Sequence, residues 1–171
     1  MDKSSSQKQV KVNELDSITI RFAGDSGDGI QLVGHQFANA TAIAGNDLST
    51  LPDYPSEVRS PAGSLGGVSG FQLNFGDESV LTPGTRPNVL VAMNPAALIV
   101  NIKNIDKGSV IIVNSDAFTP GALEKAGYAA NPLEDGTLSN YRVLAVPVNT
   151  LTESALKDSG LDLEKENRDE I

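Results

Sequence analysis

The sequence predicts an α/β fold with three layers (α/β/α), in which helices cover both faces of a mostly parallel sheet that includes an antiparallel or edge strand. First, a strand-like alternation over residues 17–23 leads through a glycine-rich turn into a helical pattern that ends at Gly45. Second, residues 88–93 and 109–113 form apolar runs that are typical of buried parallel strands. Third, a helical pattern joins these two runs, and such a unit should have a right-handed connection. We therefore expect a Rossmann-like arrangement.

The first helix and the joining helix have distinct sequence signals. The first should bury one apolar face, made of Ile30, Val33, Gly34, Phe37, Ala38 and Ala44. The joining helix should begin at Asn94-Pro95, because Asn is a preferred N-cap and Pro is favoured at the first helical position.

The other elements are shorter. A strand should start near residue 46 and break at Pro52, because proline interrupts strand pairing. Residues 68–75 alternate between apolar and polar side chains, which predicts an antiparallel or edge strand with one solvated face. A short helix is expected within residues 119–125 and a last strand at 141–146. Thr150 and Glu153 fit a capping box for a final helix.

The chain has 171 residues, enough for one domain with a sizeable core. We interpret residues 1–16 as a flexible leader, because they are polar and rich in serine and lysine. Residues 17–160 form the α/β domain, and the charged residues 161–171 are a tail or the start of a linker to further domains.

Composition excludes several classes of function. The formal net charge of −9 argues against a nucleic-acid-binding protein. The chain has no cysteine, so it holds no disulfide, no catalytic thiol and no cysteine-bound iron–sulfur cluster, which fits a cytoplasmic protein. The polar start of the sequence predicts no signal peptide, and no apolar run reaches membrane-spanning length.

The glycine-rich turn is the first candidate site. It comprises Gly24, Asp25, Ser26, Gly27, Asp28 and Gly29. Its place between a strand and a helix is where α/β sheets bind ligands. The glycine spacing is not that of a dinucleotide-binding loop, and two aspartates would repel a phosphate unless they are paired or face away. The alternative is a turn in which Asp25, Ser26 or Asp28 only caps the helix.

Two more side chains are candidates for binding. Arg59 lies in a long irregular segment and could bind a phosphate, a carboxylate or an acidic partner residue; alternatively it is a surface arginine paired with Glu57. Asn94 lies at the carboxyl end of a strand, where it could contact a ligand or only cap its helix. No catalytic motif accompanies the single histidine, His35, so we expect no catalytic residue and no metal site on this chain, and a domain that binds or docks.

Several stretches together resemble one family, the 2-oxoacid:ferredoxin oxidoreductases. The resemblance is to the gamma-type domain at the N-terminus of the alpha subunit in 2-oxoglutarate-type enzymes. The stretches run in family order: FAGDSGDGIQ (22–31), GNDL (45–48), LPDYP (51–55), EVR (57–59), PAG (61–63), GVSGFQ (67–72), TPG (82–84) and VAMNPAAL (91–98).

The resemblance implies an enzyme that oxidatively decarboxylates a 2-oxoacid with coenzyme A, reduces ferredoxin and releases an acyl-CoA and CO2. Thiamine diphosphate, Mg and an iron–sulfur cluster would lie in other domains of the alpha subunit and in the beta subunit. By position, the Gly24–Gly29 turn, Arg59 and Asn94 would face the coenzyme A region. The chain alone should have no turnover. An independent nucleotide-binding module and a pure subunit-assembly module remain the alternatives.

Overall fold

The fold centres on a six-stranded sheet with the strand order β2-β3-β1-β4-β5-β6. The computed structural model describes residues 15–25, 27–54 and 67–159. The strands are β1 (Ser17–Asp25), β2 (Asp47–Asp53), β3 (Val68–Gly76), β4 (Val89–Ala92), β5 (Val110–Asn114) and β6 (Arg142–Val146). Strands β1, β4, β5 and β6 are mutually parallel, and β3 is antiparallel to both of its neighbours. The predicted mostly parallel sheet with an antiparallel strand is confirmed.

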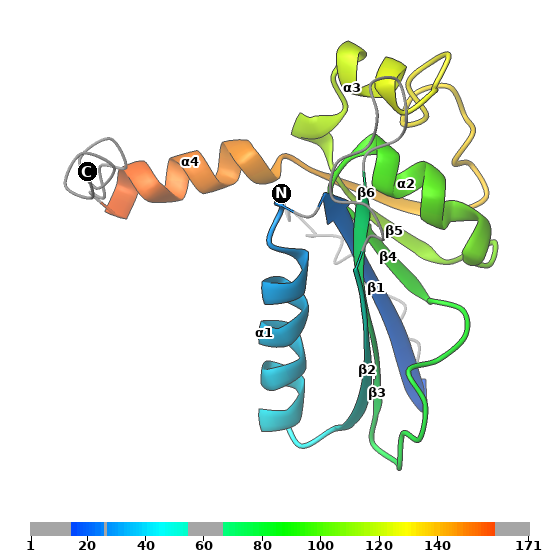
Figure 1. Cartoon of the computed structure of the whole chain (residues 1–171), viewed down its shortest axis with the longest axis vertical. Helices are drawn as coiled ribbons and strands as arrows, with labels where there is room; N and C mark the ends of the chain where they lie inside the picture. Colours follow the sequence, from blue (N-terminus) through cyan, green and yellow to red (C-terminus); the bar gives the residue numbers. More distant parts are fainter. Residues whose placement is uncertain (1–14, 26, 55–66, 160–171) are drawn as a thin grey trace, which may run out of the picture.

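Helices flank the sheet on both faces, as the three-layer prediction requires. They are α1 (Ile30–Ile43), α2 (Pro95–Asn101), α3 (Pro120–Lys125) and α4 (Val148–Ser159), with the short 3-10 turns η1 (Ile102–Asn104) and η2 (Ser115–Ala117). Figure 1 shows α1 on one side of the sheet and α2 on the other, with α4 extending away on the side of α1. Among the described residues, no helix is long and apolar enough to cross a membrane.

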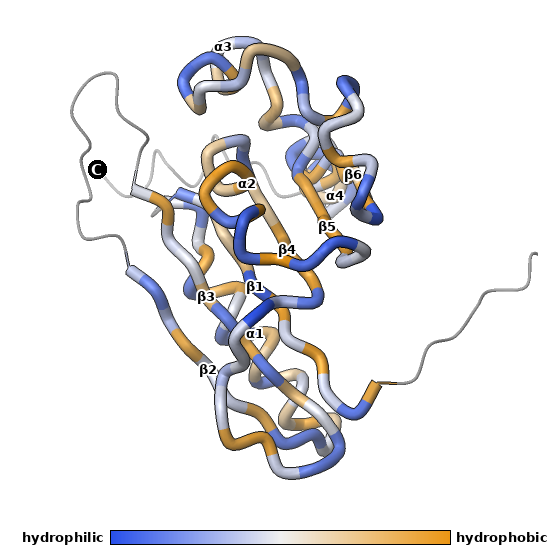
Figure 2. The backbone as a smooth tube through the Cα atoms, turned by 90° about the vertical axis from the view of Figure 1, so that its right-hand side faces the viewer, coloured by the Kyte–Doolittle hydropathy of each residue, from blue (hydrophilic) through white to orange (hydrophobic). Residues whose placement is uncertain are grey.

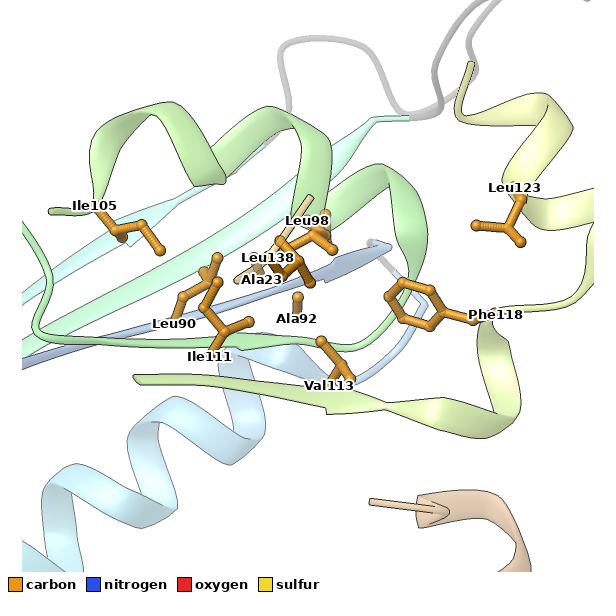
Figure 3. Packing of buried hydrophobic residues seen from close by; sticks show 11 residues of the cluster. Ala23, Leu90, Ala92, Leu98, Ile105, Ile111, Val113, Phe118, Leu123 and Leu138 are labelled. Carbon is orange, nitrogen blue, oxygen red and sulfur yellow. The ribbon is translucent and has the colours of Figure 1, made fainter. Parts of the chain in front are cut away.

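The sheet separates two apolar cores. The larger core lies between the sheet and helices α2 and α3, and Figure 3 shows its side chains gathered there. The smaller core lies under α1 and contains Phe22, Ile30, Ala38, Phe71 and Leu73. In Figure 2 the hydrophobic colour recurs along the central strands, which supply side chains to both cores. Two-sided burial explains the continuous apolar run of β4, because Leu90 and Ala92 lie in the larger core and Val91 packs against the smaller one.

Helix α1 buries a narrower face than the sequence predicts. Ile30, Gly34, Ala38 and Thr41 are buried, whereas Val33 is 48% exposed and Phe37 is 37% exposed. Gly34 sits directly against Phe71 of β3, so that a Cβ at this position would overlap the aromatic ring. The close approach of the backbone lets small residues form the contact and leaves the larger ones at its rim.

The prediction of a solvated face on β3 is wrong. Strand β3 lies between β2 and β1, so the sheet edges are β2 and β6. Gln72, on the polar face, is only 5% exposed. Its side-chain Nε2 donates hydrogen bonds to the carbonyl oxygens of Pro83 (2.8 Å) and Gly84 (2.7 Å). The connector that follows β3 folds back over this face and satisfies a polar side chain that alternation alone assigns to solvent.

Two expected boundaries also differ from the structure. Strand β2 continues through Pro52 to Asp53. It is an edge strand, where a residue without an N–H can be tolerated. Helix α4 starts at Val148, so Thr150 and Glu153 lie inside it and form no capping box. Instead, the backbone N–H of Val148 donates to Asn114 Oδ1 at 3.2 Å. The predicted leader and charged tail lie outside the described residues, apart from residues 15 and 16.

Candidate functional site at the carboxyl edge of the sheet

The turn after β1 brings two carboxylates together. The backbone N–H of Asp28 donates to the carbonyl of Asp25 at 3.0 Å. In return, the N–H of Asp25 donates to Asp28 Oδ2 at 2.8 Å. A Cβ on Gly24 would lie 2.8 Å from that same Oδ2 and from Ile30 Cδ1, so a larger residue here would displace both side chains. Gly29 has φ 68°, the left-handed region that glycine adopts at little cost. The tight turn is therefore built by reciprocal hydrogen bonds and by two glycines.

Asn94 connects this turn to the end of β4. Its Oδ1 accepts a hydrogen bond from the N–H of Ala97 at 2.8 Å, which caps α2 as predicted. Its Nδ2 donates to Asp25 Oδ1 at 2.9 Å and approaches Asp28 Oδ2 at 3.5 Å. Capping and a functional contact were the alternatives for Asn94, and in the structure its one amide caps α2 and donates to both carboxylates of the turn.

Neither aspartate caps α1. The N-cap of α1 is Gly29, and among the described residues no side chain caps the first turn of this helix. Instead, the carboxylate of Asp28 accepts a hydrogen bond from the backbone N–H of Asp25, and both carboxylates accept from the side chain of Asn94. The hypothesis that one of these two residues only caps the helix is therefore wrong. Ser26, the third capping candidate, lies outside the described residues.

A cavity of about 440 Å³ opens beside this cluster. It lies where β1, β4 and β5 end, and its volume is in the range of small-molecule sites. Its lining combines two carboxylates, three carboxamides and three apolar side chains: Asp25, Asp28, Asn94, Asn114, Asn149, Met93, Ala117 and Ala122. No lysine or arginine is among these residues, so the lining favours neutral hydrogen-bonding groups over anions.

Asn114 and Asn149 are site residues that the sequence analysis missed. Asn114 ends β5 and is only 5% exposed. Its Nδ2 donates to Asn149 Oδ1 at 3.1 Å, which holds the first turn of α4 against β5. The detectable signal was the position of Asn114 directly after an apolar strand, the same signal that Asn94 carries. Asn149 gave no signal because only the tertiary fold brings α4 to this edge.

Arg59 lies outside the described residues, between β2 and β3. The flanking strands end at the same edge as the turn, since Val68 pairs with Asp25 and Asp53 pairs with Gly70. The structure thus brings Asp25, Asp28 and Asn94 together at one site, and the binding role of Arg59 stays a prediction. Among the described residues, no group of three or more His, Cys, Asp or Glu side chains could hold a metal ion.

A second cluster that the sequence analysis missed lies on the α2 face. Arg21 Nε donates to Asn101 Oδ1 at 2.6 Å, and its guanidinium pairs with Asp53 at 2.5 Å. The guanidinium passes over Gly70, where a Cβ would lie only 2.7 Å from it. The cluster links β1, β2 and α2 and leaves no free charge on Arg21, so its role is structural.

Comparison with known proteins identifies the chain. The family model of pyruvate ferredoxin/flavodoxin oxidoreductase matches residues 19–162, which is more than half of the chain.

The chain belongs to the pyruvate ferredoxin/flavodoxin oxidoreductase family.

Curated relatives within the pyruvate ferredoxin/flavodoxin oxidoreductase family are longer proteins. The 2-oxoglutarate oxidoreductase subunit KorA of Mycobacterium tuberculosis is 55% identical over 146 residues, which cover 85% of this chain and 22% of KorA. The ketoisovalerate oxidoreductase subunit VorA of Methanothermobacter thermautotrophicus is 29% identical over 120 residues, which cover 68% of this chain and 24% of VorA. The chain therefore spans less than a quarter of the length of the curated relatives it matches.

Solved structures confirm the fold. The 2-oxoglutarate:ferredoxin oxidoreductase of Magnetococcus marinus, solved with 2-oxoglutarate, coenzyme A and succinyl-CoA bound, matches with a TM-score of 0.62 at 23% identity and covers 82% of this chain and 22% of that one. The pyruvate oxidoreductase subunit PORC of Thermotoga maritima matches with a TM-score of 0.54 at 20% identity, over 84% of this chain and 67% of that one. The gamma subunit of a keto/oxoacid ferredoxin oxidoreductase from Geobacter sulfurreducens gives 0.52 at 22% identity, over 77% and 61%. The predicted gamma-type fold is confirmed.

Proposed function

We propose that this chain is the gamma-type domain of a 2-oxoglutarate-type 2-oxoacid:ferredoxin oxidoreductase, and that its carboxyl-edge cavity forms part of the coenzyme A site. The observation that carries the assignment is the 55% identity to KorA over 85% of this chain. The reaction would convert a 2-oxoacid and coenzyme A to an acyl-CoA and CO2 while ferredoxin is reduced. The proposed partners are the remaining domains of a longer alpha subunit, a beta subunit and ferredoxin, and the proposed compartment is the cytoplasm.

The residues of this chain do not fit the redox and thiamine chemistry of that reaction. An iron–sulfur cluster needs cysteine thiolates, and the chain has none. A thiamine diphosphate site needs a Mg-binding carboxylate set, and the described carboxylates at the edge of the sheet are already bound by Asn94 and by the backbone of the turn. We therefore assign thiamine diphosphate, Mg and the cluster to other parts of the enzyme.

The cavity fits one part of coenzyme A. The pantetheine arm is neutral and carries amide groups, which match the carboxamides of Asn94, Asn114 and Asn149. The phosphates would be repelled by Asp25 and Asp28, so they would lie outside the cavity. Arg59 is the candidate for a phosphate contact, because guanidinium binds phosphate with two hydrogen bonds. In this arrangement the chain orients the acyl acceptor and takes no part in bond making.

The proposal is tested by titrating the 171-residue chain with coenzyme A and with pantetheine, and by following the melting temperature and the heat of binding. A ligand that binds only the folded state stabilises it by about 2.7 kcal/mol at one hundred times its Kd. ATP and NAD serve as control ligands. Asn94→Ser keeps a side chain that can cap α2 but removes the amide, so we expect weaker binding of both coenzyme A and pantetheine.

Arg59→Ala should weaken coenzyme A binding and leave pantetheine binding unchanged. Arg86→Ala is the matched control, because Arg86 forms an exposed ion pair with Asp106 and does not line the cavity. If Asn94→Ser and Arg59→Ala bind coenzyme A as tightly as the control Arg86→Ala, then Asn94 and Arg59 do not contribute to its binding. Absence of any response to coenzyme A would favour the alternative of an assembly module, and a response to ATP or NAD alone would favour an independent nucleotide-binding module.

A further inference from the structure

One half of the sheet has an apolar face that no described helix covers. The register aligns Phe71, Phe22, Val91, Ile112 and Leu144 in a single row across β3, β1, β4, β5 and β6. Phe71 and Phe22 are buried under α1, Val91 and Ile112 are only partly buried, and Leu144 is 55% exposed. Exposure rises along the row because α1 packs on β1, β2 and β3 and does not extend to β5 and β6.

A neighbouring row of aligned side chains on the same face is also uncovered by the described helices. Ile20 of β1 aligns with Val89, Val110 and Arg142 on the other parallel strands. Val89, Val110 and Arg142 line a hollow of about 390 Å³ at the amino ends of these strands. In the described part of the chain, the uncovered surface therefore spans β4, β5 and β6, and two cations, Lys107 and Arg142, lie at its amino-terminal border. We call it the β4–β6 face and define it by Val89, Val91, Val110, Ile112, Arg142 and Leu144.

The topology explains why no described helix covers this face. The connections from β4 to β5 and from β5 to β6 step in the same direction along the sheet. Right-handed connections that step in one direction place their helices on one face, here the face of α2 and α3. Figure 1 shows α2 on one side of the sheet and α1 on the other. A parallel sheet is normally covered on both faces, so the β4–β6 face needs a helix from elsewhere.

Helix α4 does not supply that cover. Only Pro147 separates the end of β6 from the start of α4. A strand and a helix that packs back on it are normally joined by about two to six residues. The first turn of α4 is also fixed in place, because the N–H of Val148 donates to Asn114 Oδ1 and the N–H of Thr150 donates to Asp116 Oδ2 at 2.8 Å. The helix therefore projects from the sheet, as Figure 1 shows.

Helix α4 itself has an apolar stripe without a partner in the described part of the chain. Val148, Leu151 and Ala155 recur at helical spacing, none of the twelve residues is buried, and Leu151 is 55% exposed. The β4–β6 face lies on the α1 side of the sheet, because Val91 packs against the core under α1 and aligns with Ile112 and Leu144. Figure 1 shows α4 projecting to that same side. Together the face and the helix form two apolar surfaces that meet at the carboxyl end of β6.

We propose that the β4–β6 face and the stripe of α4 are the docking surface for a helix from the rest of a longer subunit, an inference that rests on the proposed function. The lengths of the relatives support this occupant. KorA extends well beyond the matched part, which is 22% of its length. Even the separate PORC and gamma subunits extend beyond it, since the match covers 67% and 61% of them. The described chain ends in α4, next to the bare face.

The surface also indicates the chemistry of the occupant. An apolar side should cover Val91, Ile112 and Leu144. Arg142 is exposed at the amino end of β6 and should meet a carboxylate on the occupant. An amphipathic helix with an acidic residue near one end meets both requirements.

The test uses the absence of cysteine from this chain. Leu144→Cys, Leu151→Cys and Leu81→Cys each introduce a single thiol, and Leu81 is the control because it is 89% exposed and lies outside the docking surface. Each variant is made in the 171-residue chain and in a chimera in which residues 17–159 replace the matched segment of KorA. Labelling by a maleimide is measured by peptide mass spectrometry. We expect all three thiols to react rapidly in the 171-residue chain, and those at 144 and 151 to react at least about tenfold more slowly in the chimera.

The outcomes separate the docking surface from the proposed function. A chimera that restores 2-oxoglutarate oxidoreductase activity but labels equally at 144 and 81 would overturn the docking surface and leave the proposed function standing. A folded chimera without activity would count against the proposed function. A misfolded chimera shifts the labelling to KorA itself, with cysteine at the position aligned with Leu144. Protection at 144 in the 171-residue chain, together with a dimeric mass, would assign the surface to a second copy and overturn the proposal.

Discussion

At the scale of single residues, Asn94 shows how one side chain serves two structures. Its oxygen caps α2, and its nitrogen binds the two carboxylates of the turn after β1. The parallel pairing of β1 and β4 places these two loops at the same edge of the sheet. The amide thus couples the start of a helix to the shape of the candidate site.

Asn94→Ala should lower the free energy of unfolding by about 1 kcal/mol, because the helix loses its N-cap and the turn loses its donor. Asn94→Ser should lower it by less, since the hydroxyl can still accept from the N–H of Ala97. Urea denaturation of the three proteins measures the difference. Equal stability of the wild type and the alanine variant would contradict the role of the cap.

Replacement of two arginines by methionine should lower the free energy of unfolding by different amounts. Arg21 is 16% exposed in its side chain and satisfies Asn101, which is 1% exposed. Arg21→Met would leave the buried side-chain oxygen of Asn101 without this donor, and a buried unsatisfied polar group costs about 1–3 kcal/mol. The ion pair of Arg86 with Asp106 is exposed on both sides, and removal of such a pair costs about 0–1 kcal/mol. Chemical denaturation of Arg21→Met and Arg86→Met compares them, and equal losses would refute the structural role of Arg21.

At the scale of elements, the position of α1 depends on how closely its backbone approaches β3. Gly34 contacts Phe71, and His35 lies beside the same ring with a centroid distance of 4.9 Å. The ring of Phe37 lies beside those of Phe22 and Phe75, with centroid distances of 5.6 Å and 6.0 Å. This packing holds the N-terminus of α1, and with it the glycine-rich turn, at the edge of the sheet.

Two glycines in helices should respond oppositely to alanine. Gly34→Ala would force Phe71 to move, and overpacking of a core costs about 1–3 kcal/mol, more than the helix propensity gained. Gly121 of α3 has open space around its Cβ position, so Gly121→Ala should stabilise the protein by up to about 1 kcal/mol. Thermal unfolding measures both shifts. A stabilised Gly34→Ala would mean that α1 lies further from β3 than described.

At the scale of the whole molecule, the sheet is covered unevenly. One face carries the larger core under α2 and α3, and the other is covered by α1 over only part of its width. The larger core extends to the segment after α3, where Tyr128 packs against it. The larger part of the buried apolar core therefore lies on the α2 side, and the β4–β6 face on the other side is the proposed docking surface.

Global stability should fall at high pH because of Tyr128. Burial, followed by the negative charge of Asp135, raises the pKa of Tyr128 from 10.0 to about 12. The unfolded chain then loses the phenolic proton first, so the contribution of Tyr128 to stability is complete below pH 10 and is lost as the pH rises to about 12. Urea denaturation across this window measures the loss. The stability of Tyr128→Phe should decline less with rising pH than that of the wild type. An identical decline in both proteins would contradict the raised pKa of Tyr128.

Much of the candidate site could be predicted from the sequence, because its parts are local. The strand–turn–helix at Gly24–Gly29 and the Asn94-Pro95 cap follow from spacing and from the preferences of single residues. The contribution of Asn149 could not be predicted, since α4 reaches the cavity only through the position of β6 beside β5. Arg59 and Ser26 remain predictions.

The sequence by itself determined the succession of strands and helices along the chain, the apolar runs of the parallel strands and the absence of thiol chemistry. These features depend only on periodicity and composition. Only the tertiary structure decided that Gln72 is buried, that β2 continues through Pro52 and that Val33 lies at the rim of α1. Each of these depends on which segment packs against which, such as the connector over β3 and the close approach at Gly34. Alternation along a strand tells which side chains share a face, but burial depends on what covers that face. The bare β4–β6 face is the same case, since the apolar runs predict a buried sheet and only the topology shows which half has no described cover.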